Sequence, residues 1–324
     1  MSELMPNLGC EVGCAKEEFF TPAKLSYDGN KVITSVNGEI KTFKIPKEKS
    51  ELKMTNEISY REKETIYDYY WYSDTSKYFS IIKDHPILLH SAINNKILMK
   101  YTVQNHLCEV RAPLSLILEG DWGIYTALGN TVKYFDLETS LCYSFPLSVD
   151  ELRISPKCII SAIGGKEDLI AIGNYSKTVY LFSKDSCKTI GILEGHQGGI
   201  IQCEFRDNYL YIGCRKQNSI AAWDLRNISY PVNILNFYRQ HESNQRILFD
   251  LNENGLELAV GNGDGSIYKY STVDGSLLNY FMGHFDAINS VQVFGNRIVT
   301  SSGQRHYEEV ENPWGSLIRV WSYE

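Results

Sequence analysis

The sequence predicts an all-β fold, a propeller of seven repeated sheets, from a motif that recurs seven times along the chain. In each copy a β-branched residue precedes a ring by three positions. The seven rings are Phe43, His90, Phe135, Phe182, Trp223, Tyr270 and Trp321. Successive rings are 41 to 51 residues apart, and a repeat of roughly 40–45 residues that ends in a Trp-Asp-like strand is typical of WD40 blades. We therefore expect residues 1–324 to form a single seven-bladed WD40 propeller.

The strands of one repeat can be placed most clearly in the fifth blade. A glycine-rich loop at residues 194–199 precedes an apolar strand at 200–205. Further strands are expected at 209–214 and 220–224, separated by turns at Asp207-Asn208 and at 215–219. In propeller geometry the loop with His196 and the turn with Arg215 emerge on the same face.

The two ends of the sequence are expected to meet in the last blade. Trp321 closes a third strand, and three residues follow it. Residues 1–19 can supply the missing outer strand, with residues 8–14 as the strand itself. Pairing of the N- and C-terminal strands would close the ring and remove exposed sheet edges.

Two stretches depart from the repeat. Residues 46–65 mix lysine and glutamate and predict a weak outer strand with an exposed loop. Residues 304–313 are longer than a turn requires, which is typical of a functional loop.

Composition limits the classes of protein. Hydrophobic residues make up 43% and charged residues 22%, as in an ordinary folded protein with a sizeable core. No apolar run of 18 residues and no signal peptide is present, so we expect a soluble intracellular protein without a membrane partner. The eight cysteines include only one close pair, Cys10 and Cys14. Reduced thiols without a bound metal are therefore expected.

The distribution of arginines is informative. The net charge of −7 argues against indiscriminate coating of nucleic acid. Eight of the eleven arginines nevertheless lie at or beyond Arg206, with only two of the 21 lysines. Arginine can hold phosphate and stack on bases. The alternative is that these arginines pair with acidic residues of the same segment.

Catalytic motifs are missing from the sequence. It has no phosphate-binding Walker loop, nucleophile elbow or His-Glu-x-x-His. The glycines at 261, 263 and 265 precede a strand, which indicates a hairpin turn. We therefore expect no enzymatic activity, no cofactor and no small-molecule substrate.

Several rings are predicted to be structural. His196 and His284 each follow a glycine before a first strand, and we expect them to hydrogen-bond toward the strands of Trp223 and Trp321 rather than contact a ligand. Tyr67, Tyr69 and Trp71 could stack on bases, but their alternation in a first strand favours core packing. Residues 223–226, Trp-Asp-Leu-Arg, also have the form that some propellers use to dock on a cullin ligase adaptor.

Three passages go beyond the WD40 repeat. They are residues 64–73, ETIYDYYWYS; residues 193–200, LEGHQGGI, with GCRK and WDLR after them; and NQRI at 244–247 with SSGQR at 301–305. In these passages, and from about Phe20 to the end, the chain resembles the telomerase Cajal body protein family. Larger family members carry further sequence outside the propeller.

The resemblance implies a non-enzymatic RNA-binding scaffold. Family members recognise a short loop motif in box H/ACA small nuclear RNAs, including telomerase RNA, and promote localisation of these particles to nuclear bodies. Fungal relatives are linked to spliceosomal RNA. The expected partners are thus a small nuclear RNA and ribonucleoprotein core proteins. The expected location is the nucleus, in the Cajal body.

Eight residues form the predicted RNA-binding site. They occupy a turn of the fifth blade, the approach to the sixth and the corresponding turn of the seventh: Arg215, Lys216, Asn244, Gln245, Arg246, Gln304, Arg305 and His306. Asn and Gln can read base edges while Arg holds phosphate or stacks. The alternative is a protein-interaction scaffold, a splicing-factor platform or a cullin-ligase substrate receptor, whose arginines bind acidic partners.

Overall fold

The computed structural model describes residues 5–15, 18–46, 54–149, 152–153, 158–232, 237–238, 244–303 and 316–323. Within these residues the regular structure consists of strands, and no helix occurs. Consequently, no helix in the described part of the chain is long and apolar enough to span a membrane.

The strands of the described residues form seven antiparallel sheets of four strands, named here blades 1 to 7. Blade 1 contains β2 (Lys24–Leu25), β3 (Lys31–Val36), β4 (Glu39–Lys44) and β5 (Thr55–Arg61). Blade 2 contains β6 (Ile66–Trp71), β7 (Lys77–Ile82), β8 (Ile87–Ser91) and β9 (Ile97–Tyr101). Blade 3 contains β10 (Leu116–Glu119), β11 (Gly123–Leu128), β12 (Thr131–Asp136) and β13 (Cys142–Pro146). Blade 4 contains β16 (Ile160–Lys166), β17 (Leu169–Asn174), β18 (Val179–Ser183) and β19 (Lys188–Leu193).

The remaining blades follow the same order. Blade 5 contains β20 (Ile200–Arg206), β21 (Tyr209–Cys214), β22 (Ser219–Asp224) and β23 (Phe237–Tyr238). Blade 6 contains β24 (Phe249–Leu251), β25 (Glu257–Gly261), β26 (Ser266–Ser271) and β27 (Leu277–Met282). Blade 7 contains β28 (Ile288–Phe294), β29 (Arg297–Ser302), β30 (Leu317–Ser322) and β1 (Asn7–Gly13). A separate pair joins β14 (Ser148–Val149) to β15 (Leu152–Arg153). This confirms the predicted class, a seven-bladed β-propeller.

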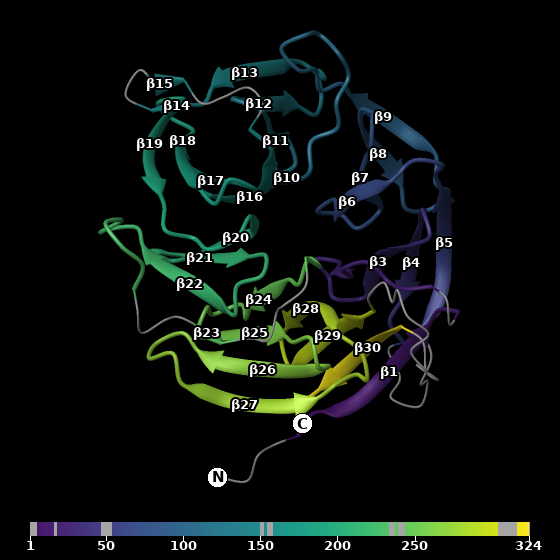
Figure 1. Ribbon diagram of the computed structural model, residues 1–324. Coiled ribbons are helices and arrows are strands. Elements are labelled where there is room, and N and C mark those ends of the chain that lie inside the picture. The colour runs from purple at the N-terminus through teal and green to yellow at the C-terminus, as the bar shows by residue number, and fades with distance from the viewer. Residues whose placement is uncertain are drawn as a thin grey trace. The chain divides into compact units, whose positions relative to one another are not determined.

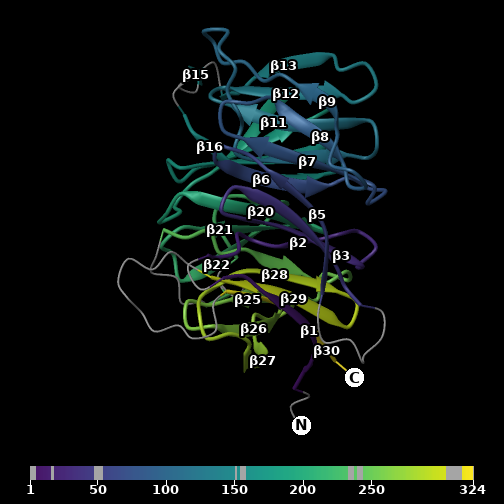
Figure 2. The ribbon, with the colours of Figure 1, turned by 90° about the vertical axis from the view of Figure 1, so that its right-hand side faces the viewer.

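The N-terminal strand completes blade 7, as predicted. β1 pairs antiparallel with β30, from Asn7 opposite Ser322 to Gly13 opposite Leu317. Figures 1 and 2 show the purple β1 alongside the yellow β30. Arg319 on β30 donates from Nε to a Glu11 carboxylate oxygen at 2.8 Å, and Cys10 is buried against the sheet. The strand begins one residue before the predicted range and ends one residue before its end.

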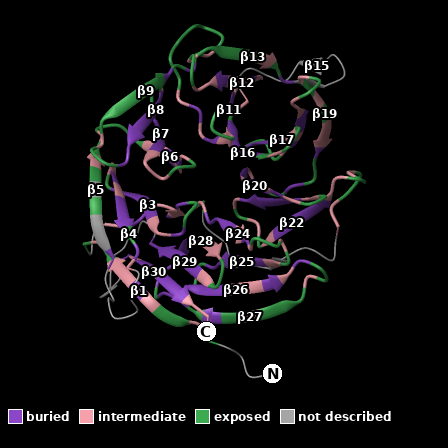
Figure 3. Ribbon diagram, turned by 180° about the vertical axis from the view of Figure 1, so that it is seen from behind, coloured by how far each residue is buried: buried purple, intermediate pink, exposed green. Residues whose placement is uncertain are grey.

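Burial changes from the second strand of a blade to the outermost strand. The second strands β7, β17 and β29 are buried along almost their whole length. The outer strands β9, β13 and β27 are mostly exposed, as their green colour in Figure 3 shows. The buried apolar residues of the sequence repeat therefore belong mainly to the inner strands of each blade.

The described structure consists of two compact units. Unit 1 comprises residues 1–63, 92–95 and 234–324, and unit 2 comprises residues 64–91 and 96–233. In unit 1, Phe43 packs edge-on against Phe20, with ring centroids 6.2 Å apart. In unit 2, Trp223 belongs to a core cluster with Leu210 and Ile212. Tyr69 and Trp71 are buried as well, which favours the interpretation of these two rings as core residues.

Candidate nucleic-acid interface

A backbone hydrogen bond ties two loops together in blades 4 and 5. The residue directly after the second strand donates its N–H to the residue directly before the first strand. In blade 5, Arg215 donates to the Gly199 carbonyl at 2.8 Å, and in blade 4, Tyr175 donates to the Ile159 carbonyl at 3.0 Å. Tyr175 and Arg215 therefore occupy equivalent positions in consecutive blades.

Two glycines allow the loop before β20 to pack between these positions. A Cβ on Gly198 would lie 1.8 Å from the Arg215 carbonyl oxygen. A Cβ on Gly199 would lie 3.0 Å from Cδ1 of Tyr175. The Gly-Gly pair of the sequence is thus explained by a close approach of backbones that leaves no room for a side chain.

Tyr175 and Arg215 are in direct contact across the two blades. The guanidinium carbon of Arg215 lies 4.8 Å from the centroid of the Tyr175 ring. Nη2 of Arg215 also donates to the Tyr175 hydroxyl at 3.0 Å. The ring and the hydroxyl together fix the guanidinium plane, because a cation–π contact and a hydrogen bond act on the same group.

The surroundings of this pair are positively charged. Three loops meet here, at residues 174–178, 194–199 and 214–219, and Glu194 is the one acidic residue in their sequences. They carry Lys177, Arg215 and Lys216, named here the cation cluster; both lysines are exposed and Arg215 is half-buried. A local positive field thus exists in a chain whose net charge is −7.

One predicted residue of unit 1, Gln245, contacts Gly303. Nε2 of Gln245 donates to the Gly303 carbonyl at 2.6 Å, and Nδ2 of Asn289 donates to the same oxygen at 3.3 Å. Asn244 is exposed and Arg246 is half-buried. The Gln245 side chain is thus bound to the backbone of Gly303, the residue that precedes Gln304. Gln304, Arg305 and His306 lie outside the described residues.

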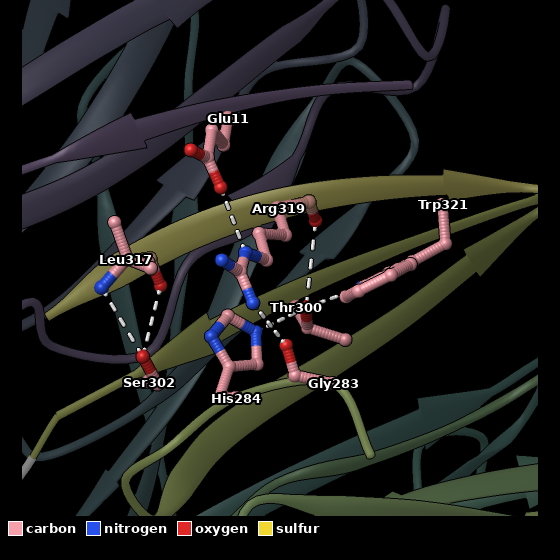
Figure 4. Close-up of polar contacts among 8 residues, drawn as sticks. All are labelled: Glu11, Gly283, His284, Thr300, Ser302, Leu317, Arg319 and Trp321. Carbon is pink, nitrogen blue, oxygen red and sulfur yellow. Dashed lines mark hydrogen bonds and ion pairs between the residues drawn. The ribbon is translucent and has the colours of Figure 1, made fainter. Parts of the chain in front are cut away.

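His284 and Trp321 are joined through a hydroxyl in blade 7. Nε2 of His284 lies 2.6 Å from Oγ1 of Thr300, and the Trp321 indole N–H donates to that oxygen at 2.9 Å (Figure 4). Burial, with Arg319 nearby, lowers the pKa of His284 to about 3. His284 is therefore neutral near pH 7 and braces the strand of Trp321.

Blade 5 has the same two rings without the hydroxyl. Trp321 pairs with Ile298, two residues before Thr300, and Trp223 pairs with Leu210, two residues before Ile212. Ile212 thus stands where blade 7 has Thr300. The rings of His196 and Trp223 are 5.8 Å apart, and in the described structure neither His196 Nε2 nor Trp223 Nε1 has a hydrogen-bond partner. Burial lowers the pKa of His196 to about 4.

His90, the one histidine among the seven repeat rings, is held in blade 2 by a ring and a hydroxyl. It stacks on Tyr78, with ring centroids 4.8 Å apart, and its Nε2 lies 2.8 Å from Oγ of Ser80. Ser80 lies two residues beyond Tyr78, the strand partner of His90. The Ser80–His90 pair therefore repeats in blade 2 the Thr300–Trp321 arrangement of blade 7.

Tyr175 and Lys177 were missed at the sequence level. The available signal was the glycine that is the second-last residue of both second strands, since Gly173-Asn174-Tyr175 and Gly213-Cys214-Arg215 align. The Trp-Asp-Leu-Arg motif also has a local role. Arg226 Nη2 lies 2.6 Å from an Asp224 carboxylate oxygen, and the hydrogen bonds from Arg226 lower the pKa of Asp224 to about 2.

The chemistry of the described residues gives no sign of a metal centre. No group of three or more His, Cys, Asp or Glu side chains in the described ranges could hold a metal ion. All eight cysteines are free.

Comparison with known proteins identifies relatives of the chain. Telomerase Cajal body protein 1 of Mesocricetus auratus is 29% identical over 331 residues, which cover 91% of this chain and 60% of that protein. Its Homo sapiens counterpart is 28% identical, over 92% of this chain and 59% of its own length. Guanine nucleotide-binding protein negative regulator 1 of Schizosaccharomyces pombe is 26% identical, over 94% of this chain and 88% of its own length. The chain thus spans about 60% of the length of the mammalian relatives. No protein-family model matches the chain.

Proposed function

Because the chain is a relative of the telomerase Cajal body proteins, we propose that it is a non-enzymatic scaffold that binds small nuclear RNA. The RNA is of the box H/ACA type or telomerase RNA, and the protein acts in the nucleus, in the Cajal body. Ribonucleoprotein core proteins are its further partners. The proposal draws on the names of these relatives, which contain both telomerase and the Cajal body.

The cation cluster is the observation that best supports this proposal. Its three cations outnumber the one acidic residue of these loops, Glu194, and the Arg215 guanidinium is oriented by Tyr175. Arginine held in a fixed plane suits both phosphate and bases, whereas lysine supplies point charges for phosphate. In unit 1, Asn244 and Arg246 offer the same chemistry, and Gln245 orients the backbone that precedes Gln304 and Arg305.

The test is sequencing of RNA that is crosslinked to the protein in its own cells. The variant carries Arg215→Ala, Arg246→Ala and Arg305→Ala together. We expect one class of small nuclear RNA to be enriched with the natural protein and lost with the variant, whose thermal unfolding should be nearly unchanged. Equal recovery of that RNA with the variant would contradict the assigned residues.

A protein-interaction scaffold is the second candidate. The Schizosaccharomyces pombe relative aligns over 88% of its own length, and its name describes regulation of another protein. In this case the arginines bind acidic segments of a splicing factor or a ligase substrate. Absence of any RNA enrichment, with a protein partner recovered instead, would favour this candidate.

A further inference from the structure

We propose that Tyr175 and Arg215 form a platform on which one unpaired RNA base stacks, with Lys177 and Lys216 on the flanking phosphates. The inference rests on the proposed RNA-binding function and names the surface of unit 2 that carries it. Arg215 contacts the base, and Tyr175 is a positioning residue that holds the guanidinium.

The orientation of Arg215 is fixed from three sides. Its backbone N–H is bound by Gly199, its guanidinium lies over the Tyr175 ring, and its Nη2 is bound by the Tyr175 hydroxyl. A guanidinium fixed in this way loses little freedom when a base stacks on it, so binding costs less conformational entropy.

Tyr175 is placed for a surface function rather than for the core. Its side chain is 37% exposed, whereas Tyr211 in the neighbouring blade is 2% exposed. The ring covers a cation instead of an apolar cluster. Unpaired bases are commonly recognised by stacking on aromatic rings and arginine planes.

The cation cluster outweighs the one acidic residue of its loops, Glu194. Among the described residues, Lys177, Arg215 and Lys216 form no ion pair. Other cations of the same unit do: Lys184 pairs with Glu119, and Arg226 pairs with Asp224. A binding partner that brings negative charge to both sides of the platform would therefore complete this surface, as the phosphates on either side of one nucleotide do.

The experiment separates stacking from charge. The full chain is titrated with a fluorescent RNA hairpin that has a randomised single-stranded loop, and with the blunt duplex of its stem, at several salt concentrations. Arg215→Lys keeps the charge but removes the flat guanidinium. We expect it to weaken hairpin binding about tenfold, with the salt slope unchanged. Lys177→Ala and Lys216→Ala should each lower that slope by about 0.7.

Two variants test the role of Tyr175 as the positioning residue. Tyr175→Ala should weaken hairpin binding about as much as Arg215→Lys, since stacking is worth on the order of tenfold or more per base. Tyr175→Phe keeps the ring and loses only the hydroxyl contact, so it should restore most of the affinity. Arg226→Lys, at the other end of β22, is the matched control and should bind as the natural protein does.

The outcomes distinguish the platform from the proposed function. The platform is supported if the natural protein binds the hairpin better than the duplex and if Arg215→Lys and Tyr175→Ala each weaken hairpin binding. Tight binding that neither variant changes overturns the platform and leaves RNA binding intact. No binding of either RNA by the natural protein overturns both.

Discussion

The imidazole Nε2 of His284 lies 2.6 Å from Oγ1 of Thr300. The same oxygen accepts the indole N–H of Trp321, so one hydroxyl contacts a nitrogen of each of two buried rings. Blade 5 has the rings His196 and Trp223 but places Ile212 where the hydroxyl would be. The two blades therefore differ in whether a hydroxyl lies between the two rings.

Removing that oxygen should destabilise blade 7. In Thr300→Val the shape of the side chain is kept, but His284 Nε2 and the Trp321 indole lose a buried partner. Leaving a buried polar group unsatisfied costs about 1–3 kcal/mol. We expect the free energy of unfolding from urea titration to fall by about 2 kcal/mol. A loss below about 0.5 kcal/mol would contradict the bridging role, because that is the size of an ordinary surface substitution.

Adding the oxygen to blade 5 should have the opposite effect. Ile212→Thr and Ile212→Val remove nearly the same volume from a fully buried site, and only threonine can bridge His196 and Trp223. The Thr variant should therefore be more stable than the Val variant by about 1 kcal/mol. In an ordinary apolar site the order is reversed, since burying an unpaired hydroxyl costs free energy. Calorimetry of the two variants decides between these orders.

Acid should destabilise the protein through the two buried histidines. Their pKa values, about 4 for His196 and about 3 for His284, lie below the 6.5 of an unperturbed histidine. At pH 7 both are neutral in the folded state and mostly neutral in the unfolded chain. Below pH 6.5 the unfolded chain takes up protons that the folded chain does not, so the free energy of unfolding falls.

The size of this acid effect can be measured between pH 7 and pH 5. Each histidine should contribute a loss of roughly 2 kcal/mol at pH 5. The variant His284→Gln cannot titrate at this position, so its stability should depend less on pH by that amount. An identical pH dependence in the variant would show that His284 does not carry the effect.

The glycine loop gives a steric prediction. Gly198→Ala would place a Cβ 1.8 Å from the Arg215 carbonyl oxygen, so the loop or the turn has to move. We expect a loss of about 3 kcal/mol or more, since overpacked contacts typically cost 1–3 kcal/mol and this one meets backbone. Gly195→Ala is the control. It has no atom within 4 Å of the added Cβ but a φ of +90°, so it should lose only about 1 kcal/mol. Thermal unfolding of both variants checks the order.

The fold was predictable because its determinants are local and repeated. Apolar strands, glycine turns and a ring at a fixed place in each copy specify a blade without knowledge of its neighbours. The outer strand β1 followed from the need to cover the edge of β30, and its range was predicted to within one residue.

The details of the candidate site depend on register and on contacts between blades. The partnership of Ser80 with His90 becomes visible only when β7 and β8 are aligned, and the same holds for Ile212 beside Trp223. Tyr175 and Arg215 are 40 residues apart in sequence and meet through equivalent turns of consecutive blades. A sequence pattern identifies such residues singly, whereas their contact depends on how the blades stack.

The RNA-binding surface can be located by mapping the amino acids that crosslink to RNA. The natural protein is irradiated with its cellular RNA and then digested. The peptides that carry a nucleotide are identified by mass spectrometry. We expect crosslinks in the turns that hold Tyr175 and Arg215 and in the loop of Gly198. Crosslinks confined to the turns at the other ends of the second strands, such as that of the exposed Trp122, would contradict it.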